Sequence, residues 1–242
     1  SASVGVYVYY YAQGTLSLYN MSFSSLTQAI YFVSYYGATV NLYNCTISQN
    51  QMTLQNFATG QVNVIWPLQV EVVWPNGAAA SLAFAVITNQ SGGVLYADLV
   101  GVNGVSPSLW IPGISIRMSQ GSADTITNTP LFVKVYANGT ISTPYEFTFN
   151  GTTFVRLVIQ DTIPPTVNLF APLDGSRFDS SVVRVWGNAF DVGSGMDFVE
   201  ASADGGLTWA PSDAPLPGWS MDLTLGDGTH DIIVRAFDRS GT

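Results

Sequence analysis

Hydrophobic and polar residues alternate over short stretches along the whole chain, and Gly, Asn and Pro separate these stretches. A period of two predicts β-strands that turn one face inward. An example is the segment in which Leu16 and Leu18 flank Ser17. No segment longer than about ten residues shows a convincing helical period. The pattern therefore predicts an all-β protein.

One of these stretches recurs after 24 residues. Residues 15–24 align with residues 39–48, five of the ten pairs are identical, and four others are close replacements. A fixed period of about 20–50 residues indicates a solenoid, in which successive coils bury each other's faces. A third and poorer copy surrounds Val62–Val64, and we expect Trp66 to help cap the stack.

The repeated motif Leu-Tyr-Asn-x-Ser/Thr-Phe/Ile-Ser resembles the coils of right-handed parallel β-helix proteins of the pectin-lyase-like type. Such coils are about this long and often carry an Asn after a short strand. The resemblance implies that Asn20 and Asn44 lie at a bend, where one side-chain amide stacks on the next.

Residues 67–160 contain seven short alternating segments, which predict a β-sandwich. Asn138-Gly139 and Asn150-Gly151 are strong signals for tight turns between strands. A Val-x-Val strand, Gly77 and an Ala-Val-Ile strand that ends at Asn89 resemble the transthyretin-like, carboxypeptidase-regulatory-like modules. The predicted strands are Leu68–Val72, Ser81–Thr88, Val94–Val100, Ile114–Met118, Leu131–Ala137, Tyr145–Phe149 and Phe154–Ile159.

The last segment, 161–242, begins with a stiff linker, because Pro164-Pro165 favours an extended backbone. A series of Gly, Asp and Ser positions follows that resembles the immunoglobulin-like modules of bacterial and archaeal surface proteins. The residues that carry this resemblance are Gly187, Ala189, Asp191, Ser194, Gly195, Val199, Ser202, Asp204, Gly205, Gly206, Thr208, Trp209, Gly228, His230, Val234, Arg235, Ala236, Asp238 and Gly241.

The expected architecture is therefore a short right-handed parallel β-helix segment at 1–66, followed by two sandwiches. The first sandwich, 67–160, is transthyretin-like or immunoglobulin-like, and the second, 161–242, is immunoglobulin-like. Because the chain opens inside a repeat, we expect it to be a piece of a larger protein. Neither a signal peptide nor an apolar run long enough to span a bilayer is visible.

Charge is scarce and unevenly distributed. Charged residues make up 10% of the chain, and none occurs before residue 67. Residues 1–160 carry a net charge of −1 and residues 161–242 a net charge of −8. Nucleic-acid binding needs clusters of Lys and Arg, so this composition argues against it. General acid–base catalysis needs a titratable group, so we expect no catalytic residue in the first unit.

The single cysteine and the single histidine are expected to be structural. Cys45 aligns with Met21 in the repeat, which favours a packed core position over a reactive thiol. His230 follows a Gly-Asp-Gly turn, so we expect a surface or structural side chain; a ligand or base is the alternative. We accordingly predict no catalytic residue and no bound organic cofactor.

Acidic turns after residue 160 leave calcium as the one candidate metal. Asp191, Asp197 and Asp204 lie among Gly and Ser residues, which favours either a calcium site or turns whose carboxylates bond nearby backbone amides. No contiguous calcium-loop motif is present, and both interpretations remain open.

Five segments satisfy the acceptor pattern for N-glycosylation. Asn138 and Asn150 are the preferred acceptors, because they occupy predicted exposed turns. A buried amide ladder would hide Asn20 and Asn44. The five candidate acceptors are Asn20, Asn44, Asn89, Asn138 and Asn150.

Nine tyrosines crowd the first unit, and alternation cannot bury them all. They form either a stacking surface for sugars or for another copy of the protein, or simply good strand residues at half-exposed positions. The tyrosines are Tyr7, Tyr9, Tyr10, Tyr11, Tyr19, Tyr31, Tyr35, Tyr36 and Tyr43.

These observations predict a structural, extracellular protein of a cell surface, of the S-layer, adhesin or filament kind, whose partners are other copies or other surface proteins. Two alternatives remain open. One is the non-catalytic part of an extracellular glycan-active enzyme or protease, and the other is a module that binds polysaccharide.

Overall fold

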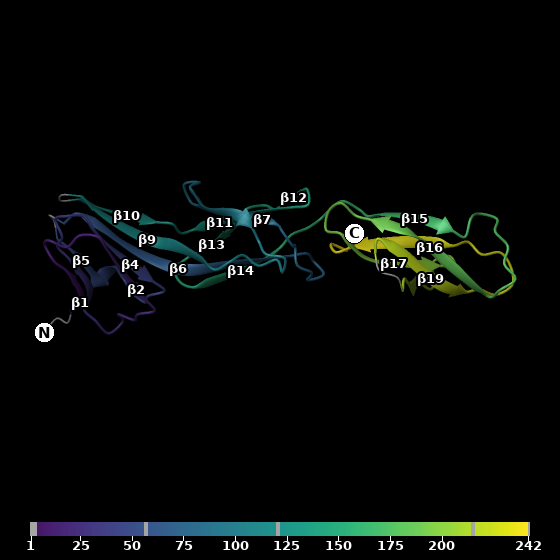
Figure 1. The fold of residues 1–242 in the computed structure, drawn as a ribbon, viewed down its shortest axis with the longest axis horizontal. Coiled ribbons are helices and arrows are strands. Elements are labelled where there is room, and N and C mark those ends of the chain that lie inside the picture. Colours follow the sequence, from purple (N-terminus) through teal and green to yellow (C-terminus); the bar gives the residue numbers. More distant parts are fainter. Residues whose placement is uncertain (1–3, 56–57, 120–121, 214–215, 242) are drawn as a thin grey trace.

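The computed structural model describes residues 4–55, 58–119, 122–213 and 216–241 (Figure 1). Within these residues the regular structure consists of β-strands and one short 3-10 helix, Gln49–Gln51. The predicted all-β class is therefore confirmed. The molecule is elongated, with the N-terminal coils at one end and the last segment of the chain at the other. No helix in the described part of the chain is long and apolar enough to cross a membrane.

The first part of the chain forms two parallel sheets, and each coil contributes one strand to each sheet. Thr15 lies opposite Thr39, so the offset of 24 residues seen in the sequence is the register in space. In the next turn the offset is 22 residues, and Ala38 lies opposite Gly60. One sheet holds β1 (Val4–Val8), β3 (Gln28–Phe32) and β5 (Met52–Leu54), and the other holds β2 (Thr15–Tyr19), β4 (Ala38–Tyr43) and β6 (Gly60–Val73).

The space between these sheets is apolar. Phe32, Val40 and Leu42 are almost completely buried. Cys45 lies in the same core, as predicted, although its repeat partner Met21 is exposed, and burial raises the pKa of the Cys45 thiol. Each fully buried side chain of this size contributes about 1.5–3 kcal/mol, so apolar burial stabilises the stacked coils.

Strand β6 connects the coils to the following sandwich. Its first half pairs in parallel with β4, and its second half pairs in parallel with β14 (Thr153–Val158). The expected boundary between residues 66 and 67 falls inside this strand. Val64, Trp66 and Leu68 are all buried on its inner side, and one hydrophobic core extends from the coils into the sandwich. Trp66 packs edge-on against Phe149 instead of closing the stack.

The sandwich places two sheets around this shared core. The predicted strands in 67–160 are present with shifted ends, but the sequence did not indicate the two-residue β12 or β10, whose residues are all exposed. Because β10 has no inward face, its sequence lacks the alternation that predicts a strand. Besides β6 and β14, the strands are β7 (Phe84–Asn89), β8 (Val94–Leu99), β9 (Leu109–Ser119), β10 (Ser122–Thr127), β11 (Leu131–Ala137), β12 (Thr140–Ile141) and β13 (Tyr145–Phe147).

Residues 166–238 form a second sandwich from two three-stranded sheets with a core of their own. Buried Val185, Val199 and Trp219 lie in this core. Gly187 has no space for a side chain, because a Cβ there would lie 1.9 Å from the carbonyl oxygen of Asn168. One sheet is β15 (Thr166–Ala171), β16 (Val182–Phe190) and β19 (Gly218–Thr224), and the other is β18 (Ala210–Pro211), β17 (Met196–Ser202) and β20 (Ile233–Asp238).

Candidate functional site

The tyrosines of the first coil stack on those of the second coil. The parallel register places Tyr19 over Tyr43, with ring centroids 4.6 Å apart. Tyr7 stacks on Tyr31 at 5.1 Å in the other sheet. We call these stacked tyrosines together the tyrosine ladder; it consists of one group around β1 and β3 and the separate pair Tyr19–Tyr43 on β2 and β4, and its members are Tyr7, Tyr9, Tyr10, Tyr11, Tyr19, Tyr31, Tyr35, Tyr36 and Tyr43. Most of these side chains are exposed, as the sequence predicted.

The first coil leaves apolar surface uncovered. Leu16 in β2 is 43% exposed, whereas Val40, its partner in β4, is 1% exposed. Among the described strands, β1 pairs with β3 alone and β2 pairs with β4 alone. Each of them therefore presents an open strand edge, and such an edge can accept another strand.

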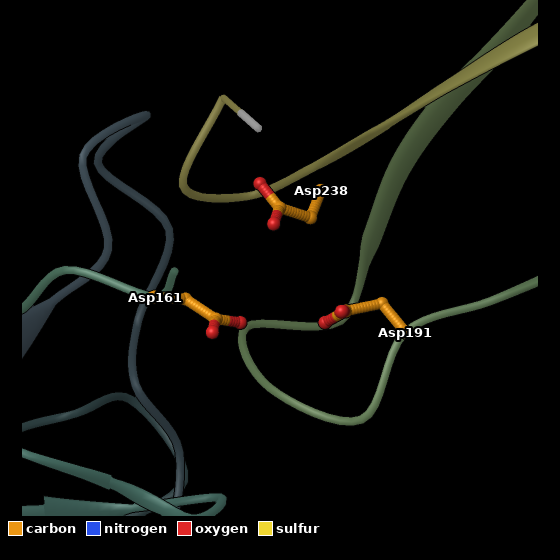
Figure 2. A group of neighbouring side chains, drawn as sticks. All are labelled: Asp161, Asp191 and Asp238. Carbon is orange, nitrogen blue, oxygen red and sulfur yellow. The ribbon is translucent and has the colours of Figure 1, made fainter. Parts of the chain in front are cut away.

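Three aspartates from distant segments meet between the two sandwiches (Figure 2). We call Asp161, Asp191 and Asp238 the aspartate cluster. Asp161 begins the linker, Asp191 follows β16, and Asp238 ends β20. One carboxylate oxygen from each lies within 4.8 Å of the other two. The side chains of Asp161 and Asp191 point toward each other (Figure 2).

The aspartate cluster is buried and electrostatically unfavourable for three carboxylates. Asp161 and Asp238 are each 1% exposed, and Asp191 is 8% exposed. Burial raises the pKa of the Asp191 carboxyl, and the charges of Asp161 and Asp238 raise it further. The backbone N–H of Gly195 donates a 2.5 Å hydrogen bond to Asp191 Oδ2 and lowers the pKa. Asp191 Oδ1 and the hydroxyl oxygen of Ser194 are buried without a hydrogen-bond partner among the described residues.

Backbone groups hold the cluster in place. Asp161 Oδ2 accepts a hydrogen bond from the N–H of Ser194, and Asp161 Oδ1 accepts one from Ile163 at 3.0 Å. Asp238 Oδ1 accepts a 2.8 Å hydrogen bond from the N–H of Ser240. The bonds from Ile163 and Ser240 close local turns, whereas the bond from Ser194 joins segments 33 residues apart, and together they fix the carboxylates of Asp161 and Asp238 in place.

Contacts across the junction surround the cluster. The backbone N–H of Asp161 donates a 2.8 Å hydrogen bond to the hydroxyl of Ser240. The side-chain amide of Asn138 donates to the carbonyl of Gly193 at 2.8 Å. A Cβ on Gly193 would lie 1.7 Å from Asp161 Oδ2, so only glycine leaves room for this carboxylate. The junction is therefore packed and hydrogen-bonded on both sides of the linker.

Of the three residues expected to hold calcium, only Asp191 belongs to the aspartate cluster. Asp197 is exposed at the start of β17. Asp204 is exposed and caps its own turn, since both the hydroxyl and the N–H of Thr208 donate to its carboxylate. Asp161 and Asp238 were not among the residues predicted to bind calcium. Their positions at the two ends of the last unit were a usable signal, because the ends of a sandwich strand pair can meet at one pole.

The five candidate glycosylation sites differ in what their amides do. Asn20 and Asn44 form the expected ladder, but they are exposed, and the expectation that the ladder is buried was wrong. The amide of Asn89 donates to Asn128, and that of Asn138 to Gly193. Asn150 is exposed in the bend before β14, and its side chain forms no hydrogen bond within the described residues.

His230 lines a hollow beside Asp204. One ring nitrogen lies 2.9 Å from the carbonyl oxygen of Gly226 and the other 3.4 Å from that of Ala203. Hydrogen bonds from Thr208 lower the pKa of Asp204 to about 2, which makes this carboxylate a weak base at neutral pH. The contacts of His230 with the carbonyl oxygens of Gly226 and Ala203 give this histidine a structural role in the turn.

No protein-family model and no curated protein matches the chain. Among solved structures, a DUF3823 family protein from Bacteroides ovatus is similar over 72% of this chain and 81% of its own length, with 10% identity and a TM-score of 0.29. The major pilin subunit BcpA of Bacillus cereus is similar over 74% of this chain and 66% of its own length, with 8% identity and a TM-score of 0.32.

Proposed function

We propose that the chain is a structural component of an extracellular, cell-surface assembly of the S-layer, adhesin or filament kind. In this proposal residues 1–66 are the coils of a short right-handed parallel β-helix, 67–160 a transthyretin-like or immunoglobulin-like sandwich, and 161–242 an immunoglobulin-like sandwich. The first two units act as one body, because β6 belongs to both.

One observation carries the proposal: the first coil exposes apolar side chains and two open strand edges. Proteins usually protect such edges with Pro or with charged side chains, Lys above all. Neither β1 nor β2 contains any of these residues. The first coil therefore offers a surface that another parallel pair of strands would cover, from a second copy of the chain or from further coils of the same protein, with the next tyrosines continuing the ladder.

The alternative of polysaccharide binding fits the tyrosine ladder less well. Sugar rings pack on the faces of aromatic side chains. The stacked pairs Tyr19–Tyr43 and Tyr10–Tyr35 already cover one face of each ring with the other. Stacking between copies would extend this arrangement through the outer faces of Tyr19 and Tyr10, which stay exposed.

A charge placed on the first coil tests the proposal. We expect the unaltered chain to form oligomers or fibres as its concentration rises, seen by sedimentation and by electron microscopy. The double variant Leu16→Lys and Tyr19→Lys should remain monomeric, because two cations on β2 oppose edge pairing. Tyr145→Lys is the matched control, since Tyr145 is 49% exposed on β13, away from the coils.

An unaltered chain that stays monomeric up to about 1 mM, the range of the weakest specific contacts, would contradict the proposal. Equal loss of assembly in the Tyr145→Lys control would place the contact elsewhere. Binding to a glycan array that the double variant abolishes, without assembly, would support the polysaccharide alternative.

A further inference from the structure

The geometry of the aspartate cluster matches the reach of one calcium ion. Calcium binds oxygen ligands at about 2.3–2.6 Å, so two ligands of the same ion lie at most about 5 Å apart. The carboxylate oxygens of Asp161, Asp191 and Asp238 lie within 4.8 Å of one another. All three carboxylates can therefore reach a single ion between them.

A second observation points to a ligand at this place. Asp191 is nine-tenths buried, its carboxylate points into the cluster, and its Oδ1 has no hydrogen-bond partner among the described residues. The buried hydroxyl of Ser194 also lacks one. Burying a polar atom without a partner destabilises the fold, and burying a charge destabilises it more. A cation would satisfy the unpaired oxygen of Asp191.

Basic side chains do not supply this cation for two of the three carboxylates. Within the described residues, no Lys or Arg forms an ion pair with Asp161 or Asp191. Arg239 lies beside the turn, 3.3 Å from the position of a Cβ on Gly195. Within the described residues, Arg239 forms no ion pair with Asp161 or Asp191, and the buried carboxylates of these two residues face each other.

The donor set selects the kind of metal. The cluster offers carboxylate and hydroxyl oxygens, which hard cations prefer, and neither Cys nor His. Cys45 lies in the core of the coils, and His230 bonds to two carbonyls elsewhere. Calcium accepts irregular sets of six to eight oxygens, including water and backbone carbonyls, while magnesium demands a near-ideal octahedron. The irregular arrangement favours calcium.

We propose that Asp161, Asp191 and Asp238 bind one calcium ion that ties the linker to the last sandwich. Asp161 belongs to the linker, whereas Asp191 and Asp238 belong to the sandwich beyond it. An ion held by all three would restrain the angle between the two sandwiches. This proposal does not depend on assembly of the chain.

The test uses the whole chain, treated with a chelator and then titrated with calcium chloride in a calorimeter. We expect one calcium ion per chain and weaker binding of magnesium. A hundredfold excess of calcium over Kd should raise the melting temperature by about 5 °C or more. Cleavage of the linker near exposed Ile163 by protease should become slower with calcium than with chelator.

Variants locate the ion. Asp191→Asn should weaken calcium binding by at least about 10- to 100-fold, because it removes a charged ligand. Asp197→Asn is the matched control, because Asp197 is an exposed aspartate of the same sandwich. This variant should bind calcium as tightly as the unaltered chain does. Asp238→Asn provides a second test at the same site if Asp191→Asn does not fold.

Absence of both binding heat and a change in melting temperature in the unaltered chain would overturn the proposal without reference to any variant. Calcium binding that survives Asp191→Asn and Asp238→Asn, or that is lost in Asp197→Asn, would also overturn it. In either case the aspartates would serve only as caps of their turns.

Discussion

The side-chain amide of Asn44 donates a 2.8 Å hydrogen bond to Oδ1 of Asn20, its counterpart one coil earlier. Both residues have positive φ, 51° for Asn44 and 54° for Asn20. Asn is among the few residues other than Gly that adopt this conformation readily. The repeated Asn therefore bends each coil and links it to the next.

Replacing Asn44 should separate these two roles. Asn44→Ala loses the ladder bond and adds backbone strain, and we expect a loss of about 2 kcal/mol in the free energy of unfolding. Asn44→Gly loses only the hydrogen bonds, including the one that Asn44 Oδ1 accepts from Thr152, so about 1 kcal/mol should be lost. Urea titration measures both. Equal losses in the two variants would show that backbone strain is unimportant here.

Gly113 is required for the packing of Trp66. A Cβ on Gly113 would lie 2.1 Å from Cζ3 of the Trp66 ring, which is buried against Phe149. Gly113→Ala should lower the free energy of unfolding by about 2–3 kcal/mol, since the ring must move within a packed core. Gly151→Ala is the control, because nothing lies within 4 Å of its Cβ position. A similar loss in both variants would argue against the ring contact.

Asp204 should make part of the stability dependent on pH. Hydrogen bonds from Thr208, and from the hydroxyl of Ser202, lower its pKa from 3.8 to about 2 in the folded chain. Because the folded pKa lies below the unfolded value, the ionised carboxylate stabilises the fold above about pH 4. This contribution disappears as the pH falls toward 2.

Melting curves from pH 2 to pH 6 test this sign. Asp204→Ala should melt below the unaltered chain by a constant interval above about pH 4, and the two should converge near pH 2. Asp197→Ala controls for the loss of one exposed acidic charge. A difference between Asp204→Ala and the unaltered chain that grows toward low pH would contradict the assignment.

Glycan occupancy should follow the freedom of each amide. We expect Asn150 in native material to carry a glycan, because it is exposed and its side chain makes no hydrogen bond within the described residues. Asn89 and Asn138 should be occupied less, since their amides donate to Asn128 and Gly193. Peptide mass spectrometry measures each site. Bare Asn150 beside modified Asn138 would reverse this order.

Much of the first region could be predicted because its contacts repeat at a fixed offset. Parallel stacking places each strand residue of the first coil beside the one 24 positions later, so Tyr19 and Tyr43 carry the same chemistry as neighbours in space. The exposure of Asn20 and Asn44 could not be predicted in the same way. Periodicity shows which residues are equivalent, but not whether solvent reaches the bend where they lie.

Alternation of polar and apolar residues alone determined the all-β class and most of the strands, since a strand's inward face is a local property. Only the tertiary structure decided that β6 belongs to both the coils and the sandwich. It alone also brought Asp161, Asp191 and Asp238 together. These residues, distant in the chain, lie close together because β16 and β20 both end near the point where the linker enters the sandwich. No local sequence pattern predicts that proximity.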